Sequence, residues 1–94
     1  MNKNEYVTKN NIFEDLGFTK VEAINLKARS ELMIALRKFI EKNKLTQKAA
    51  AEKLGVDQPQ ISRLLKGKIS NFTIDKLILM LSRAGIKVSI KVAA

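Results

Sequence analysis

The side chains best suited to chemistry lie between Leu45 and Lys68, in the segment LTQKAAAEKLGVDQPQISRLLKGK. This segment predicts two short helices joined by a tight turn. The second helix begins with uncharged side chains that form hydrogen bonds, and it ends in a basic flank. Amide side chains can pair with the edges of bases and basic side chains with phosphates, so the segment is suited to placing one helix end in the major groove of DNA.

Composition removes most other kinds of chemistry. The 94 residues include no cysteine and no histidine, which excludes disulfides, the common zinc sites and Ser–His or Cys–His nucleophilic catalysis. The sequence has no glycine-rich phosphate loop, and its few carboxylates mostly stand at helix caps or on helix faces. We therefore expect neither an enzyme nor a bound cofactor or metal. RNA binding is a further possibility for a basic helical domain, but this sequence lacks an aromatic platform on which bases could stack.

The formal net charge of +9 lies entirely in the second part of the chain. Residues 1–31 carry five basic and five acidic side chains, whereas residues 32–94 carry 13 basic and four acidic ones. A basic half attracts a polyanion at long range. Many basic proteins merely have a solvated surface, however, so charge alone leaves nucleic-acid binding open.

Residues 1–18 are expected to form a partly ordered leader, followed by one helical domain over residues 19–94. Tyr6 and Val7 can form a brief strand in this leader. The sequence has no signal peptide and no apolar run near the ~20 residues of a membrane span, so the cytoplasm is the default location. Four apolar side chains at the end of the leader are expected to pack on the core: Ile12, Phe13, Leu16 and Phe18.

Capping residues predict where the first and longest helix begins. Thr19 and Glu22 form a capping box, and apolar residues at spacings of three and four then predict a helix that ends near Asn43. A second start at Ser30 would divide this stretch into two helices. The predicted apolar face of this long helical stretch comprises Val21, Ile24, Ala28, Leu32, Ala35, Leu36, Phe39 and Ile40.

Caps and glycines also delimit the two short helices. Thr46 can cap the first of them, and Gly55 stops it in a left-handed conformation that other residues adopt at a higher cost. Asp57 can cap the second, where Gln60 completes another capping box. Gly67 ends this second helix.

The chain closes with a further helix and an alternating tail. Thr73 caps the helix and Gly85 stops it, and the strict apolar–polar alternation from Ile86 to Val92 then predicts a half-buried β-strand. A strand needs a partner, which can be the Tyr6–Thr8 region or, as we expect, the same strand of a second copy across a two-fold axis. A tail packed loosely on the helices is the remaining alternative. The residues expected to mediate dimerisation are Ile86, Val88, Ile90 and Val92.

The two-helix segment carries a resemblance to a known family through the spacing of Gln47, Ala51, Gly55, Ile61 and Leu64. This spacing resembles the helix-turn-helix of Cro/C1-type (XRE) repressors; an ordinary helical hairpin with Ala and Gly at these places is the alternative. The run NLKARSELMIALRKFIEKNKLTQ and the tail AGIKVSI extend the resemblance to small regulators of the HigA antitoxin group. The resemblance implies a mainly α, lambda-repressor-like domain, and a DNA-binding dimer encoded beside a toxin that represses its own operon.

The resemblance also implies roles for individual residues. Gln58 and Pro59 would touch base edges, and Ser62 and Arg63 would face the same groove one turn later. Gln can pair with adenine, Arg with guanine or a phosphate, and Pro can make only apolar contacts. Gln60 is also a candidate for contact with DNA, but it lies nearer the cap and can serve the helix instead. Phosphate contacts are expected from Thr46, Gln47, Lys48, Lys66, Lys68, Ser70 and Asn71.

Two functions follow, and they are compatible. The first is a repressor that binds a palindromic operator as a homodimer. The alternative for the polar residues of the second short helix is a solvated face without DNA contacts. The second is an antitoxin whose main role is to neutralise a toxin protein. Phe13 and Phe18, in the charge-neutral first 31 residues, could dock such a partner or could simply cover the core. Lys87 and Lys91 are expected to be solvated charges at the strand edge.

Overall fold

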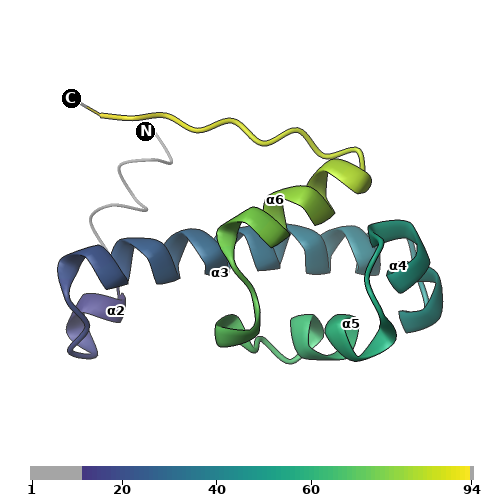
Figure 1. Ribbon diagram of the computed structural model, residues 1–94, viewed down its shortest axis with the longest axis horizontal. Coiled ribbons are helices and arrows are strands. Elements are labelled where there is room, and N and C mark those ends of the chain that lie inside the picture. The colour runs from purple at the N-terminus through teal and green to yellow at the C-terminus, as the bar shows by residue number, and fades with distance from the viewer. Residues whose placement is uncertain (1–11, 94) are drawn as a thin grey trace.

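One long helix, α3, organises the fold. The computed structural model describes residues 12–93, and α3 runs through them without a break from Lys20 to Lys42. The other elements are α2 (Ile12–Asp15), α4 (Gln47–Leu54), α5 (Gln58–Leu65), the 3-10 helix η1 (Ile69–Asn71) and α6 (Ile74–Arg83). Figure 1 shows α4, α5 and α6 grouped around the C-terminal part of α3, with α2 beside its N-terminal end. Among residues 12–93, none of these helices combines the length and the apolar character needed to cross a membrane.

Side-chain caps begin α3, α4, α5 and α6 at the predicted residues. The Thr19 hydroxyl accepts a hydrogen bond from the Glu22 backbone N–H at 3.2 Å, and the Glu22 carboxylate accepts one from the Thr19 N–H at 2.9 Å, which confirms the first capping box. The hydrogen bond from the Thr19 backbone N–H lowers the pKa of Glu22 below its ordinary value of 4.5, and the Thr19 hydroxyl lowers it further. Thr46, Asp57 and Thr73 accept hydrogen bonds from the third residue of their helices in the same way.

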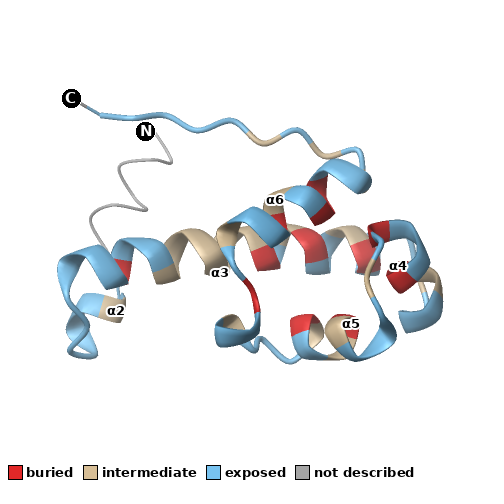
Figure 2. Ribbon diagram, in the orientation of Figure 1, coloured by how far each residue is buried: buried red, intermediate tan, exposed pale blue. Residues whose placement is uncertain are grey.

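The core lies between the C-terminal part of α3 and the helices that follow it, as the buried positions in Figure 2 show. Its largest fully buried side chains are Leu36, Leu54, Ile61, Leu64, Phe72, Leu77, Met80 and Leu81. Each such side chain contributes roughly 1.5–3 kcal/mol through burial. Because Ile61 and Leu64 anchor α5 from one side, the opposite side of that short helix faces solvent.

The prediction for α3 is only partly right. The helix continues through Ser30, so it is not divided in two, and Asn43 caps its C-terminal end as expected. Leu36 and Ile40 are buried, but Val21 and Ile24, on the same predicted apolar face, are 78% and 57% exposed. The physical reason is that α4, α5 and α6 cover only the C-terminal part of α3. Its first turns extend beyond them (Figure 2).

The prediction that the end of the leader packs on the core is wrong. Ile12, Leu16 and Phe18 are exposed and lie outside the core cluster. Phe13 is half-buried, and its ring packs edge-on against Phe18 with 6.2 Å between ring centroids. These side chains miss the core because α2 lies at the opposite end of α3 from it (Figure 1). The strand predicted at Tyr6 and Val7 lies outside the described residues.

The predicted C-terminal β-strand for dimerisation is also wrong. No strand occurs within residues 12–93, and the tail after α6 is an extended segment without a backbone ladder. Ile86 and Val88 pack on the core of their own chain, whereas Ile90 and Val92 are 74% and 90% exposed. The alternation of apolar and polar residues therefore correctly indicated that one side of the tail is apolar, and the first part of that side packs on the helices. It did not provide the backbone partner that a strand needs.

Candidate nucleic-acid interface

The helices α4 and α5 form the predicted two-helix unit, joined by Gly55, Val56 and Asp57. Gly55 has φ 71° and ψ 34°, the left-handed conformation predicted for the turn. The Val56 N–H donates to the Ala51 carbonyl at 3.0 Å and closes the end of α4. Ala50 and Ala51 are buried, and their small side chains let neighbouring helices approach closely. The geometry is that of a helix-turn-helix.

Arg83, in the last turn of α6, holds this turn from a distant part of the chain. Its Nη1 donates to the carbonyl oxygens of Leu54 at 3.2 Å and Gly55 at 3.1 Å. Carbonyls at the end of a helix have no partner within that helix, and a positive charge beside them is favourable. Arg83 could not be predicted from the sequence, because the contact spans 28 residues and leaves no local pattern.

We expect Gly55→Ala to cost about 1–2 kcal/mol for the left-handed backbone and about 1 kcal/mol more for the displaced Arg83 contact. The added Cβ would overlap the Arg83 guanidinium. Gly67→Ala is a matched control, because Gly67 also has φ 71° but a Cβ there would meet no atom within 4 Å. Urea denaturation measures both losses. Equal losses for the two variants would contradict the role given to Arg83.

The residues predicted to read bases lie at the start and along the outer side of α5. Gln58, Pro59 and Arg63 are exposed, and Ser62 is half-buried. Pro59 occupies the first turn of the helix, as predicted. We call these four residues the reading face. The structure gathers them on one short helix.

Gln60 does not complete the second capping box. Asp57 accepts the predicted hydrogen bond from the Gln60 backbone N–H at 2.9 Å. The side chain of Gln60, however, turns the other way, and its Oε1 accepts a hydrogen bond from Arg63 Nη1 at 3.0 Å. A charged donor one turn along the helix offers a stronger hydrogen bond than a neutral backbone N–H, which explains the preference.

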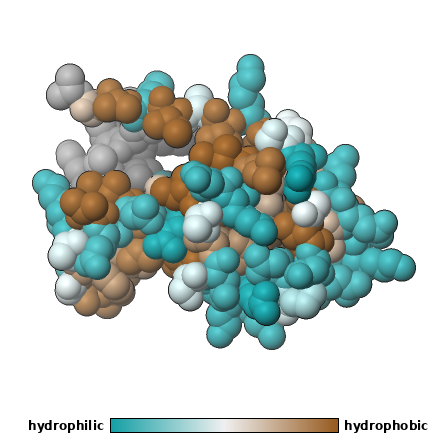
Figure 3. Space-filling model, in the orientation of Figure 1, coloured by the Kyte–Doolittle hydropathy of each residue, from teal (hydrophilic) through white to brown (hydrophobic). Residues whose placement is uncertain are grey.

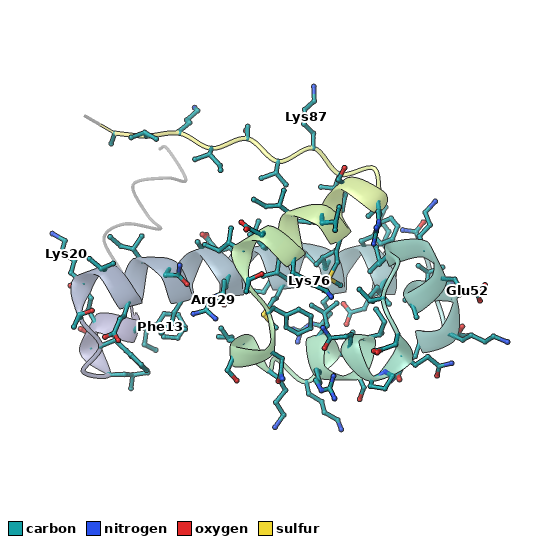
Figure 4. All side chains as sticks on the ribbon, in the orientation of Figure 1. Phe13, Lys20, Arg29, Glu52, Lys76 and Lys87 are labelled. Atoms are coloured by element: carbon teal, nitrogen blue, oxygen red, sulfur yellow. The ribbon has the colours of Figure 1, made fainter. Side chains whose placement is uncertain are left out.

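The residues predicted to contact phosphates lie on both sides of the reading face. Those at the start of α4 and those after α5 are all exposed: Thr46, Gln47, Lys48, Lys66, Lys68, Ser70 and Asn71. The Thr46 hydroxyl already accepts a hydrogen bond from the Ala49 N–H at 3.0 Å, so it serves the helix cap first. Figure 4 shows nitrogen-tipped side chains projecting from α5 and the following loop, away from the C-terminal tail.

Comparison with known families decides what this geometry is. A family model described as a helix-turn-helix domain matches residues 12–93. This chain belongs to the helix-turn-helix domain family. The match extends from α2 to the tail and so includes the elements that surround the two-helix unit. Membership supports a DNA-binding regulator in the general sense, with DNA as its partner. A search of curated proteins finds no match.

A second arginine holds the loop that follows α5 in this helix-turn-helix domain. Arg29 Nη1 donates to the carbonyl oxygens of Ile69 at 3.3 Å and Phe72 at 3.2 Å, and Arg29 Nε donates to Asn25 Oδ1 at 2.7 Å. Figure 4 shows Arg29 between α3 and this loop. The loop carries Ser70 and its neighbours, so α3 positions part of the predicted phosphate-binding surface. The contact with Ile69 spans 40 residues, so no local sequence pattern predicts it.

The helix-turn-helix domain has two ends of different chemistry. Within the described residues, residues 32–85, which exclude the tail, carry 11 basic and four acidic side chains, and residues 12–31 carry three basic and four acidic ones. Figure 3 shows a largely hydrophilic surface over α4 and α5, with apolar patches near α2 and along the tail. The ion pair found among residues 12–93 is an exposed one, Arg37 with Glu41 at 4.0 Å. Most basic side chains at the α4–α5 end are therefore available to a polyanion.

Proposed function

We propose that this helix-turn-helix protein is a Cro/C1-type (XRE) repressor that binds a palindromic operator as a homodimer. The observation that carries the proposal is the orientation of α5. Ile61 and Leu64 anchor one side of it in the core, and the reading face lies exposed on the other. An α-helix with its side chains is about 10–12 Å across, which suits a major groove about 12 Å wide.

The chemistry of the reading face supports direct recognition of bases. Gln58 can form two hydrogen bonds with adenine N6 and N7, and Arg63 can form two with guanine O6 and N7. Pro59 offers only apolar contact, which fits the methyl group of thymine. One such helix covers few base pairs, so a two-fold dimer with recognition helices about 34 Å apart is needed for a full operator.

The proposed dimer contact now rests on the end of the tail. Of the four residues first assigned to it, Ile86 and Val88 pack on their own core, but Ile90 and Val92 remain exposed. We infer that these two apolar side chains pack against a second copy, without strand pairing. Sedimentation at micromolar concentration is expected to give a dimer, and a monomer both with and without operator DNA would contradict the inference.

Selection from a pool of random DNA duplexes tests the proposed function. At about 0.15 M salt, the protein is expected to enrich an inverted repeat whose half-sites lie about 10 base pairs apart. The moderate salt weakens binding that depends on phosphates alone. Recovery of duplexes without any common sequence would contradict the proposal.

Lys66 and Lys68 are expected to contribute through phosphates alone. Each change, Lys66→Ala or Lys68→Ala, is expected to reduce the slope of log affinity against log salt by about one, because one fewer phosphate charge is neutralised. Lys87→Ala is the matched control. Lys87 lies on the tail and points away from α5 (Figure 4). An equal change of slope in the control would show that only total charge matters.

We infer a second, compatible role as an antitoxin of the HigA-like group. The observation that favours it is a set of exposed apolar side chains at the end of the domain opposite α4 and α5: Ile12, Leu16, Phe18, Val21 and Ile24. Exposed apolar surface of this kind often marks a protein-binding site. Co-expression with the product of the adjacent gene tests the role, and failure of the two proteins to co-purify would count against it.

A further inference from the structure

The hydrogen bond between Gln60 and Arg63 adds a feature to the reading face that its residue types alone do not contain. Arg63 Nη1 donates to Gln60 Oε1 at 3.0 Å. We propose that Gln60 is a positioning residue, which holds the Arg63 guanidinium in the orientation that reads guanine. The inference rests on the proposed function, because it specifies the base that one residue of the reading face recognises.

The position of Gln60 makes it a suitable support. It is half-buried, and its backbone N–H is fixed by the carboxylate of Asp57 at 2.9 Å. Gln60 and Arg63 are three residues apart on α5, so their side chains lie on the same face of the helix. The carbonyl oxygen of Gln60 therefore constrains a long, exposed arginine side chain that would otherwise sample many rotamers.

The hydrogen bond leaves the reading edge of Arg63 free. A guanidinium has five N–H donors, and the contact with Gln60 uses a donor on Nη1. The donors that remain include a pair that fits the O6 and N7 acceptors of guanine. Adenine presents an amino donor in place of O6, which would face the arginine donors. A fixed guanidinium should therefore select guanine more strongly than a mobile one.

The neutral character of Gln60 preserves the charge of Arg63. Within residues 12–93, no carboxylate forms an ion pair with Arg63. A glutamate at position 60 would also orient the guanidinium, but it would offset the positive charge and repel nearby phosphates. Gln60 instead provides an acceptor without an opposing charge. Gln60 can thus orient the Arg63 guanidinium without weakening its long-range attraction to DNA.

Binding to the selected duplex with a modified base tests the proposal. The guanine in question is the one whose preference disappears when the selection is repeated with Arg63→Ala. Replacing it with 7-deazaguanine, which lacks the N7 acceptor, is expected to weaken wild-type binding roughly ten-fold. The same replacement is expected to weaken Gln60→Met only about two-fold, because methionine has a similar length but no oxygen acceptor. Arg63→Ala is expected to show no dependence on N7.

Two further measurements separate a positioning role from a structural one. Gln60→Glu retains the acceptor, so it is expected to keep the ten-fold dependence on N7 while binding all DNA more weakly. The unfolding midpoint of Gln60→Met is expected to match that of the wild type. Full dependence on N7 in Gln60→Met would overturn the positioning role and leave the repressor proposal intact. A wild-type protein without any sequence preference would overturn both.

Discussion

Replacing both Gln58 and Arg63 with alanine is expected to weaken binding to the selected operator by about 100-fold or more. Each bidentate contact with a base is worth about 1–3 kcal/mol, and both side chains are exposed on α5, where no core contact is lost. Binding to unrelated DNA is expected to change much less, because the proposed phosphate contacts remain. Fluorescence anisotropy at one fixed salt concentration measures both affinities.

Lys87→Ala serves as the control for the loss of one positive charge away from α5. It is expected to leave the preference for the operator unchanged. Far-UV circular dichroism and the melting midpoint of the double variant are expected to match those of the wild type, since neither residue contributes to the core. Unchanged operator binding in both single variants would show that the reading face is misplaced.

Phe72→Ala is expected to cost about 3–5 kcal/mol of folding free energy, the range for removing a large buried aromatic side chain. Phe72 is 1% exposed and lies between η1 and α6. Its backbone carbonyl also accepts a hydrogen bond from Arg29, so a collapse around the cavity would loosen the loop after α5. A loss of this size is a large fraction of the 5–15 kcal/mol typical of small proteins.

Phe18→Ala is the matched control for that loss. Phe18 is 44% exposed and contacts Phe13 outside the core. Phe18→Ala is expected to cost about 1 kcal/mol of folding free energy or less. Urea denaturation followed by circular dichroism measures the two free energies. Similar losses for the two phenylalanines would contradict the division of the molecule into a packed half and an uncovered end.

Local hydrogen bonds were the part of the fold that the sequence predicted best. The Thr19 cap connects residues three apart, and Gly55 acts at its own backbone, so neither needs a distant partner. The cap at Asp57 was right for the same reason. The side chain of Gln60 was assigned wrongly because two acceptable partners lie within reach, and its backbone position alone does not choose between them.

Periodicity predicted apolar faces but not what covers them. Val21 and Leu36 belong to the same predicted face of α3, yet one is 78% exposed and the other is fully buried. The alternating tail raised the same problem, since Ile86 finds the core and Ile90 does not. Whether a neighbouring element reaches a given turn depends on the tertiary arrangement, which the spacing of residues along the chain does not encode.

Long-range polar contacts were beyond the sequence altogether. Arg29 and Arg83 each join segments at least 28 residues apart, and both bond to backbone carbonyls, which every residue type provides. No pairing of residue types therefore marks these contacts. They matter for the candidate interface because they hold the turn before α5 and the loop after it.

An NMR titration of the ¹⁵N-labelled protein with the selected duplex tests the central claim most directly. We expect the largest amide shifts in residues 57–63 of α5 and its cap, with smaller ones in residues 46–48 and 66–71. Residues 12–24 are expected to change little. Shifts concentrated in residues 12–24, with α5 unchanged, would contradict the claim that this helix reads DNA.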